Sequence, residues 1–166
     1  FLDESGCNTD MTRRYAYSFG GSRAVDSTPL SKPKNTTILS SIQLNGTLHY
    51  TTFSGGTTVE RFKRYLETDL LPHLNGNSVL IMDNMKSHHA KAVKNLLDSL
   101  GIRYIYLPPY SPDLNPIEKL WSKVKAFLRK FKARTLDALP NAIRNAFHAV
   151  TVSDCSGWFR FCGYAL

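Results

Sequence analysis

The pattern of hydrophobic and polar residues in the first third of the chain is typical of a β-hairpin. Residues 36–44 and 47–53 are rich in β-branched side chains, and Asn45-Gly46 separates the two runs. Asn-Gly favours the two-residue type I′ turn, in which both central residues need a positive φ. We therefore predict two antiparallel strands joined by a type I′ turn.

After this hairpin the apolar period changes to that of a helix. Apolar residues recur at helical spacing between positions 59 and 70, and Thr57 precedes Glu60 by three residues, as in a capping box. The next apolar run, residues 79–82, is short and continuous, which is typical of a strand with both faces buried. This part of the chain therefore predicts a helix and then a central strand.

A second helix, a second strand and a long helix follow. Ser87 is placed to cap a helix that Gly101 ends, and residues 102–107 form the next predicted strand. The proline-rich residues 108–116 lead into a long amphipathic helix. Residues 136–150 indicate a further helix. The apolar stripe of the long helix comprises Ile117, Leu120, Trp121, Val124, Leu128 and Phe131.

This order of elements predicts an α/β fold. We expect a mixed sheet, made of an antiparallel hairpin and a parallel half and flanked by helices. The chain shows no internal repeat or low-complexity tract, so we expect a single domain over residues 1–166. Ligands of such sheets bind beyond the carboxyl ends of the strands, and candidate chemistry belongs there.

Composition and charge indicate a packed domain with a polyanionic partner. Hydrophobic residues make up 42% of the 166 positions, enough for a core, and the longest aliphatic run is far shorter than the ~20 residues of a membrane span. The net charge is +8, and residues 119–166 hold nine basic and two acidic side chains. Because the excess charge is concentrated there, that region is the first candidate for binding an anion.

Three acidic residues lie where such a sheet would carry chemistry. Asp83 ends the apolar run 79–82, Asp3 follows a short apolar fragment, and Glu118 stands at the start of the long helix. Each has a structural alternative. Asp83 and Asp3 could open turns, and Glu118 could close a capping box with Asn115. Three carboxylates from separate elements at one sheet edge would, however, suit a pair of Mg²⁺ ions.

The residues around these acids resemble the catalytic domain of mariner-type transposases and their bacterial insertion-sequence relatives. The resemblance rests on residues 1–6 (FLDESG), on residues 81–84 (IMDN) with His88 following, and on residues 107–121 (LPPYSPDLNPIEKLW). It extends to about residue 132, and 34 residues lie between the second and third acids, as in that group. The resemblance implies a ribonuclease-H-like fold and a catalytic, metal-binding triad of Asp3, Asp83 and Glu118.

The same resemblance implies an activity and partners. Two Mg²⁺ ions, or Mn²⁺ as a substitute, would support hydrolysis of double-stranded DNA at transposon ends and strand transfer into target DNA. The full-length enzyme would be a homodimer, in the cytoplasm or nucleoid of a bacterium or in the nucleus of a eukaryote. Two departures are expected: a truncated first strand, which bears on the placement of Asp3, and the absence from this chain of the upstream helix-turn-helix modules of such enzymes.

Basic residues of the long helix are candidates for DNA contact. Seven cations and no acid lie between positions 119 and 134: Lys119, Lys123, Lys125, Arg129, Lys130, Lys132 and Arg134. A solvated helix face usually carries both signs of charge, so we predict that these residues contact phosphates. His88 is a further candidate for a phosphate contact, and its alternative is a partly exposed histidine in the first turn of a helix.

Two other functions compete with the transposase hypothesis. One is a cellular ribonuclease-H-like nuclease, and the other is a domesticated or inactive domain that binds DNA without cutting it. Cys7, Cys155 and Cys162 are odd in number and lack a Cys-x-x-Cys pair, which argues against a disulfide framework and a structural zinc site and favours a reducing compartment.

Overall fold

Five strands pair into one mixed sheet in the computed structural model, which describes residues 1–13, 15–29 and 33–164. The strand order is β3-β2-β1-β4-β5, with β1, β2 and β3 antiparallel and β1, β4 and β5 parallel. This arrangement confirms the predicted hairpin and parallel half. The strands are β1 (Leu2–Cys7), β2 (Thr36–Ile42), β3 (Leu48–Ser54), β4 (Val79–Met82) and β5 (Arg103–Tyr106).

Strand β1 lies at the centre of this sheet. It has six residues and pairs with β2 along its whole length, from Leu2↔Ser41 to Cys7↔Thr36. Asp3 is therefore the second residue of a paired strand, and the truncation of the first strand stays a prediction. Toward β4 the register contains the single pair Leu2↔Met82, so β1 continues beyond the end of β4.

The turn of the β2–β3 hairpin also differs from the prediction. Gly46 has a φ of 86°, but Asn45 does not have a positive φ, so the turn is not type I′. Instead, the Gly46 amide donates to the Gln43 carbonyl, and the Gln43 amide donates to the Thr47 carbonyl. These bonds are typical of a three-residue loop that a glycine bulge closes, because only one position then needs a left-handed residue.

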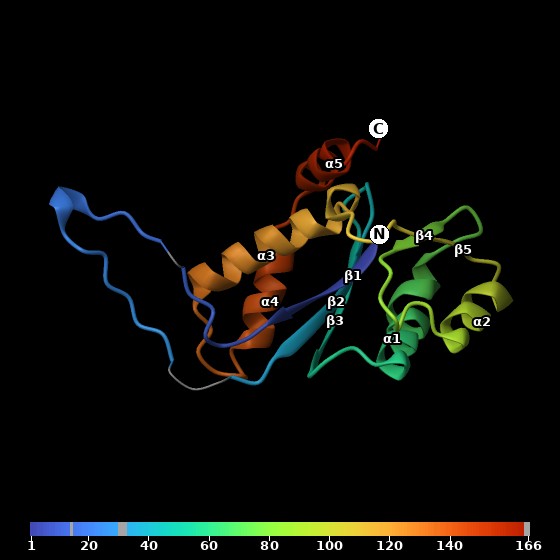
Figure 1. The fold of residues 1–166 in the computed structure, drawn as a ribbon, viewed down its shortest axis with the longest axis horizontal. Coiled ribbons are helices and arrows are strands. Elements are labelled where there is room, and N and C mark those ends of the chain that lie inside the picture. The colour runs from blue at the N-terminus through green and yellow to red at the C-terminus, as the bar shows by residue number, and fades with distance from the viewer. Residues whose placement is uncertain (14, 30–32, 165–166) are drawn as a thin grey trace.

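The described residues contain five α-helices, which pack around the sheet: α1 (Val59–Tyr65), α2 (Lys91–Ser99), α3 (Ile117–Phe131), α4 (Leu139–His148) and α5 (Val152–Phe161). A π-helical turn, Leu66–Leu70, continues α1, and short 3-10 turns span Phe19–Gly21, Leu71–His73 and Pro112–Leu114. Helices α3 and α4 lie on one side of β1 and β2, whereas α1 and α2 gather around β4 and β5 (Figure 1).

The core divides into two clusters on opposite faces of the sheet. Ile38 and Leu39 are neighbours in β2, so their side chains point to opposite faces. Ile38 packs with Leu120 and Val124 of α3, and Leu39 packs with Phe62 of α1. Each fully buried aliphatic or aromatic side chain contributes about 1.5–3 kcal/mol, so the two clusters hold the sheet between its helices.

Strand β4 is less deeply buried than its composition predicts. Leu80 and Met82 lie in the core with α1 and α2, but Val79, on the other face, is 37% exposed. Ile105 of the neighbouring strand β5 is 54% exposed on that same face. The prediction that β4 is buried on both faces is therefore wrong, because α3 and α4 cover the antiparallel half of the sheet.

Helix starts differ from the predicted caps. The N-cap of α1 is Thr58, whose hydroxyl accepts from the Arg61 amide at 3.3 Å, and not Thr57. Helix α2 begins at Lys91, after a turn that contains Ser87, so Ser87 does not cap it. The capping box that the structure does contain links Thr151 and Asp154 at the start of α5.

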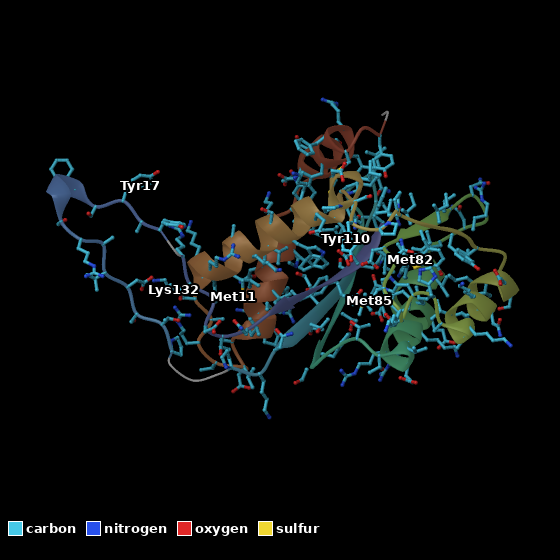
Figure 2. The ribbon with its side chains drawn as sticks, in the orientation of Figure 1. Met11, Tyr17, Met82, Met85, Tyr110 and Lys132 are labelled. Carbon is cyan, nitrogen blue, oxygen red and sulfur yellow. The ribbon has the colours of Figure 1, made fainter. Side chains whose placement is uncertain are left out.

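The segment between β1 and β2, called the arm below, comprises the described residues 8–13, 15–29 and 33–35 and projects away from the sheet and helices (Figure 1). Tyr17 is exposed far out on the arm, whereas Met11 lies at its base, beside Lys132 at the end of α3 (Figure 2). Among the described residues, no helix has both the length and the hydrophobicity that crossing a membrane requires.

Candidate active site

Three acidic residues from three elements line one cleft at the sheet edge, and Glu4, next to the first of them, lines it as well. Asp3 comes from β1, Asp83 directly follows β4, and Glu118 belongs to the first turn of α3. The cleft has a volume of about 540 Å³, and the proline-rich segment that precedes α3 forms another part of its wall. The structure thus brings together the three residues of the predicted triad.

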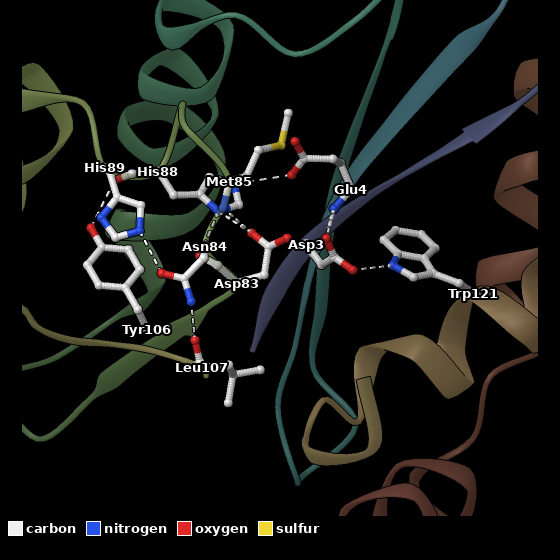
Figure 3. Close-up of polar contacts among 10 residues, drawn as sticks. All are labelled: Asp3, Glu4, Asp83, Asn84, Met85, His88, His89, Tyr106, Leu107 and Trp121. Atoms are coloured by element: carbon white, nitrogen blue, oxygen red, sulfur yellow. Dashed lines mark hydrogen bonds and ion pairs between the residues drawn. The ribbon is translucent and has the colours of Figure 1, made fainter. Parts of the chain in front are cut away.

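Asp3 is the most buried of the three carboxylates, with 8% of its surface exposed. Its Oδ1 accepts from the Glu4 amide at 2.7 Å, and its Oδ2 accepts from the Trp121 indole Nε1 at 3.1 Å (Figure 3). Burial raises the pKa of Asp3 to about 7, and the nearby charges of Asp83 and Glu118 act in the same direction against the two hydrogen bonds. Asp3 is therefore a poorly solvated carboxylate beside two other acids, and a bound cation would favour its ionised form.

Asp83 has the opposite electrostatic character. Its side chain is 45% exposed, and its Oδ1 contacts the His88 Nδ1 at 2.8 Å and accepts from the Met85 amide at 3.0 Å (Figure 3). Partial burial would raise the pKa of Asp83, but the bonds from His88 and Met85 lower it below the ordinary value. Asp83 therefore stays ionised more readily than Asp3 does.

His88 lies beneath the cleft and joins two acids. Its side chain is fully buried, with the Nδ1 at Asp83 and the Nε2 at 3.1 Å from the Glu4 Oε2. Burial would lower the pKa of His88, but its bonds to Asp83 and Glu4 raise it to about 9, so both ring nitrogens carry protons at neutral pH. The predicted phosphate contact of His88 is wrong, because DNA cannot reach a side chain with no exposed surface.

Glu118 does not form the capping box that was the alternative to a metal ligand. Helix α3 begins at Ile117 without a side-chain cap, and the Asn115 Oδ1 is buried with no hydrogen-bond partner among the described residues. The bond at this helix start runs from the Glu118 amide to the Asn115 carbonyl, at 3.1 Å. The Glu118 carboxylate is exposed at the wall of the cleft, where it is available to a ligand.

The loops that follow β4 and β5 are bonded to each other beside the cleft. The Asn84 side-chain amide donates to the Leu107 carbonyl, and its Oδ1 lies 2.9 Å from the His89 Nε2. The ring of His89 stacks on Tyr106, whose hydroxyl donates to the His88 carbonyl at 2.9 Å (Figure 3). These bonds hold Asp83 beside the segment that leads to Glu118.

Sequence reasoning missed three residues of this site: Glu4, Asn84 and Trp121. Trp121 follows Glu118 by one helical turn and was assigned to the apolar core, but its indole N–H makes it a donor to Asp3 as well. Glu4 neighbours Asp3 in a strand, so strand alternation puts it on the opposite face, toward His88. Those two spacings are the signals that could have indicated both roles.

The carboxylates suit a divalent metal by chemistry, but they do not form a ready-made cage. Carboxylate oxygens are the ligands that Mg²⁺ prefers, and one or two of them per ion are usual. Among the described residues, no group of three His, Cys, Asp or Glu side chains is arranged to hold one ion. The fit is therefore one of donor type and charge, with Asp3, Asp83 and Glu118 as the candidate ligands.

Four of the seven cations predicted to contact DNA have partners within the chain. Lys123 pairs with Asp154, and Lys132 pairs with Asp26 of the arm at 2.6 Å. Lys119 lies 3.8 Å from the centre of the Phe161 ring. Arg134 donates to the carbonyls of Thr9, Met11 and Ser27 and to the Thr12 hydroxyl, at the base of the arm.

The other three cations, Lys125, Arg129 and Lys130, have no ion pair or hydrogen bond within residues 1–13, 15–29 and 33–164. Lys125 and Arg129 line a groove of about 480 Å³ together with Arg13 and Asn35 at the base of the arm. The basic run in the sequence thus separates into four cations that serve the fold and three that face outward.

Comparison with known proteins decides the family. The sequence profile of the DDE superfamily endonucleases matches residues 1–140. The chain belongs to the DDE superfamily endonuclease family. Transposable element Tc1 transposase of Caenorhabditis elegans is 29% identical to this DDE endonuclease over 97 residues, which are 56% of the chain and 36% of that relative. The chain thus spans about a third of the length of this curated relative.

Solved structures of Mos1 transposase share the fold of this DDE endonuclease. The Mos1 paired-end complex with left transposon end matches 96% of the chain and 50% of the Mos1 chain, at 21% identity and a TM-score of 0.79. The Mos1 catalytic domain with raltegravir and Mg matches 96% of the chain and 76% of that chain, at 17% identity and a TM-score of 0.69. These matches confirm the ribonuclease-H-like fold that the resemblance implied.

Proposed function

We propose that this DDE endonuclease is the catalytic domain of a transposase, which cleaves DNA phosphodiester bonds at transposon ends and joins them to target DNA in a divalent-metal-dependent reaction. The observation that carries the proposal is the convergence of Asp3, Asp83 and Glu118 on one cleft. The relatives support it, because the Mos1 structures include a complex with a transposon end and a catalytic domain with Mg.

In this proposal Asp3, Asp83 and Glu118 hold two Mg²⁺ ions, for which Mn²⁺ can substitute. Two bound metal ions would activate a water molecule or a 3′-hydroxyl as the nucleophile, and would stabilise the charge on the leaving oxygen. The chain itself contributes orientation. Trp121 and the Glu4 amide hold the two oxygens of Asp3, and His88 and the Met85 amide hold one oxygen of Asp83. The exposed oxygens remain for the ligands.

The DNA path follows from the three outward-facing cations. Lys125, Arg129 and Lys130 lie on α3, the helix whose first turn carries Glu118, so a duplex along these residues is directed to the cleft. Such contacts are made to phosphates and do not read sequence. The partner is thus double-stranded DNA, bound through its backbone, and the full-length protein would act as a homodimer on two transposon ends.

A nicking assay on supercoiled plasmid tests the proposed activity. With Mg²⁺ or Mn²⁺, the wild-type chain should nick the plasmid, and Glu118→Gln should abolish nicking while leaving DNA binding unchanged, because glutamine removes a charged metal ligand without disturbing the helix. Glu67→Gln is the matched control, since Glu67 pairs with Lys63 on the surface at 3.0 Å, and should nick as the wild type does.

Other outcomes of this assay would favour the alternatives. Preferential cleavage of RNA–DNA hybrids would indicate a cellular ribonuclease-H-like nuclease. Binding without metal-dependent nicking would indicate a domesticated or inactive domain. Equal nicking by the wild type and Glu118→Gln would contradict the assignment of Glu118 to the triad.

A further inference from the structure

The two strands that carry Asp3 and Asp83 are weakly joined at the site. The parallel register of β1 and β4 has the single pair Leu2↔Met82, and the acids follow immediately after it. Beyond this pair, backbone hydrogen bonds of the sheet do not set the distance between the two carboxylates. A side-chain bridge crosses this gap, because His88 contacts Asp83 with one ring nitrogen and Glu4 of β1 with the other.

The ring of His88 is held from several directions. Its face packs against Phe62 of α1, with the ring centres 4.3 Å apart. The His88 amide donates to the Met85 carbonyl at 3.0 Å, and the His88 carbonyl accepts from the Tyr106 hydroxyl at 2.9 Å. A fully buried ring with these contacts has little freedom to rotate, so it fixes whatever it binds.

Glu4 shows that this bridge has a cost for the fold. Its Oε2 contacts the His88 ring, but its Oε1 is buried without a hydrogen-bond partner among the described residues. A buried carboxylate oxygen without a partner destabilises the folded state. Glu4 nevertheless supplies the partner of the buried His88 Nε2, which an apolar side chain at position 4 would leave unpaired.

We propose that His88 is a positioning residue for the metal ligands and that Glu4 is its anchor: the Glu4–His88–Asp83 bridge fixes the Asp83 carboxylate relative to Asp3 before a metal binds. This inference rests on the proposed function, because it assumes that Asp3 and Asp83 are ligands. It assigns no contact with DNA or with the reacting atoms to His88.

Metal affinity is the readout that separates positioning from simple stabilisation. Residues that orient a metal ligand typically contribute 10–100-fold in metal affinity. Mg²⁺ requires near-ideal octahedral geometry, whereas Ca²⁺ tolerates irregular ligands. Loss of the bridge should therefore weaken Mg²⁺ binding by about 10–100-fold and Ca²⁺ binding by a smaller factor. A residue that only stabilised the fold would leave the affinity of the folded protein unchanged.

The experiment measures Mn²⁺ binding by electron paramagnetic resonance, without DNA, and Mg²⁺ and Ca²⁺ binding by competition. The variants are His88→Ala, Glu4→Ala and Glu4→Gln, and the matched control is His73→Ala, because His73 stacks on His49 away from the cleft. We expect losses in the order His88→Ala, Glu4→Ala, Glu4→Gln, since glutamine retains an oxygen acceptor for the His88 Nε2. Leu139→Ala, in the core cluster on the other face of the sheet, controls for lowered stability alone and should retain the affinity of its folded fraction.

The outcomes are distinguishable. Wild-type Mg²⁺ affinity in folded His88→Ala would overturn the inference, and so would losses of equal size for Mg²⁺ and Ca²⁺. If His88→Ala does not fold, Glu4→Ala decides in its place, and wild-type affinity there overturns the inference. If Asp83→Asn binds Mn²⁺ as well as the wild type does, the proposed metal site itself fails, which differs from a failure of the bridge alone.

Discussion

In the acidic cleft, charges that are far apart in the sequence are brought together, whereas along α3, charges that are adjacent in the sequence are separated by partners from elsewhere. Asp3 and Asp83 share a cleft with Glu118, and the buried His88 links Glu4 of β1 to Asp83 at the end of β4. Asp154 forms an ion pair with Lys123 of α3, and Asp26 of the arm forms an ion pair with Lys132 at the end of α3. Both arrangements depend on contacts between distant segments.

The comparison of the cleft with α3 shows that a cluster of charged residues in a sequence does not measure the charge available to a ligand. The cleft is short of cations, and the pKa of Asp3 is raised to about 7 as a result of burial and its acidic neighbours. The basic helix offers outward the cations of Lys125, Arg129 and Lys130. The two regions together suit a DNA duplex. Metal ions in the cleft would bind one phosphodiester group, and the lysines and arginine of α3 would contact other phosphates of the same duplex.

The largest expected effect is at the acidic cleft. Asp83→Asn should reduce metal-dependent nicking by more than the ~10–100-fold that is typical for loss of a residue behind a ligand, because it removes a ligand itself. DNA affinity should not fall, since no DNA contact is lost. The measurement is the nicking rate at saturating Mg²⁺ beside a filter-binding titration. A variant that nicks at the wild-type rate would remove Asp83 from the site.

The next effect is on the salt dependence of DNA binding, and it distinguishes the outward-facing lysines of α3 from the lysines in ion pairs. The double variant Lys125→Gln/Lys130→Gln should flatten the dependence of log Kd on log salt concentration by up to ~1.8, at about 0.9 per lost phosphate contact. The matched double variant Lys123→Gln/Lys132→Gln should change the slope less, because Asp154 and Asp26 already neutralise these lysines. Equal changes in slope would mean that the internal ion pairs do not persist on DNA.

A smaller effect is expected where α3 meets the arm. Arg134→Gln removes a guanidinium that bonds three carbonyls and one hydroxyl at the base of the arm. Hydrogen bonds to charged groups contribute about 1.5–3 kcal/mol each, but partial exposure reduces that here. We expect faster amide exchange in residues 9–13 and a lower melting temperature, by a few degrees. Unchanged exchange would show that the arm is held by other contacts.

The smallest effect concerns Asp154, which forms a capping box with the N-cap Thr151 of α5 and pairs with Lys123. The Lys123 side chain is the main cause of its lowered pKa. A carboxyl with a lowered folded pKa contributes stability that is present above the unfolded value of 3.8 and lost as pH falls through the folded value. Asp154→Asn should therefore lower the unfolding free energy at pH 7 by about 1 kcal/mol, as for a lost cap.

Two measurements check this prediction. The stability difference between wild type and Asp154→Asn should shrink below pH 4 in thermal unfolding experiments. The same variant releases Lys123, so its affinity for DNA should rise slightly at low salt. A stability difference that does not depend on pH would contradict the pairing with Lys123.

Features that depend on local sequence were predicted well, and features that depend on distant contacts were not. The hairpin, the strand at 79–82 and the long helix follow from residue periods, and the fold and the position of three acids at one cleft followed from short motifs. Predictions that depend on an exact position failed. The N-cap of α1 is Thr58 and not Thr57, because both residues suit an N-cap equally and tertiary packing decides between them.

The bridge and the ion pairs could not be predicted from residue spacing. His88 meets Glu4 across 84 residues, and Lys132 meets Asp26 across 106 residues. No period or cap connects such residues, because the sheet pairing and the path of the arm bring them together. For the same reason the full burial of His88 was missed, and the motif alone suggested a surface contact.

The central claim is that Asp3, Asp83 and Glu118 form a divalent metal site. The most direct test is a crystal of this chain soaked in Mn²⁺, with anomalous scattering measured near the manganese edge. The account predicts anomalous density in the cleft between these three carboxylates, and its loss in Asp83→Asn crystals soaked in the same way. Density bound elsewhere, or none in the cleft at saturating Mn²⁺, would contradict it.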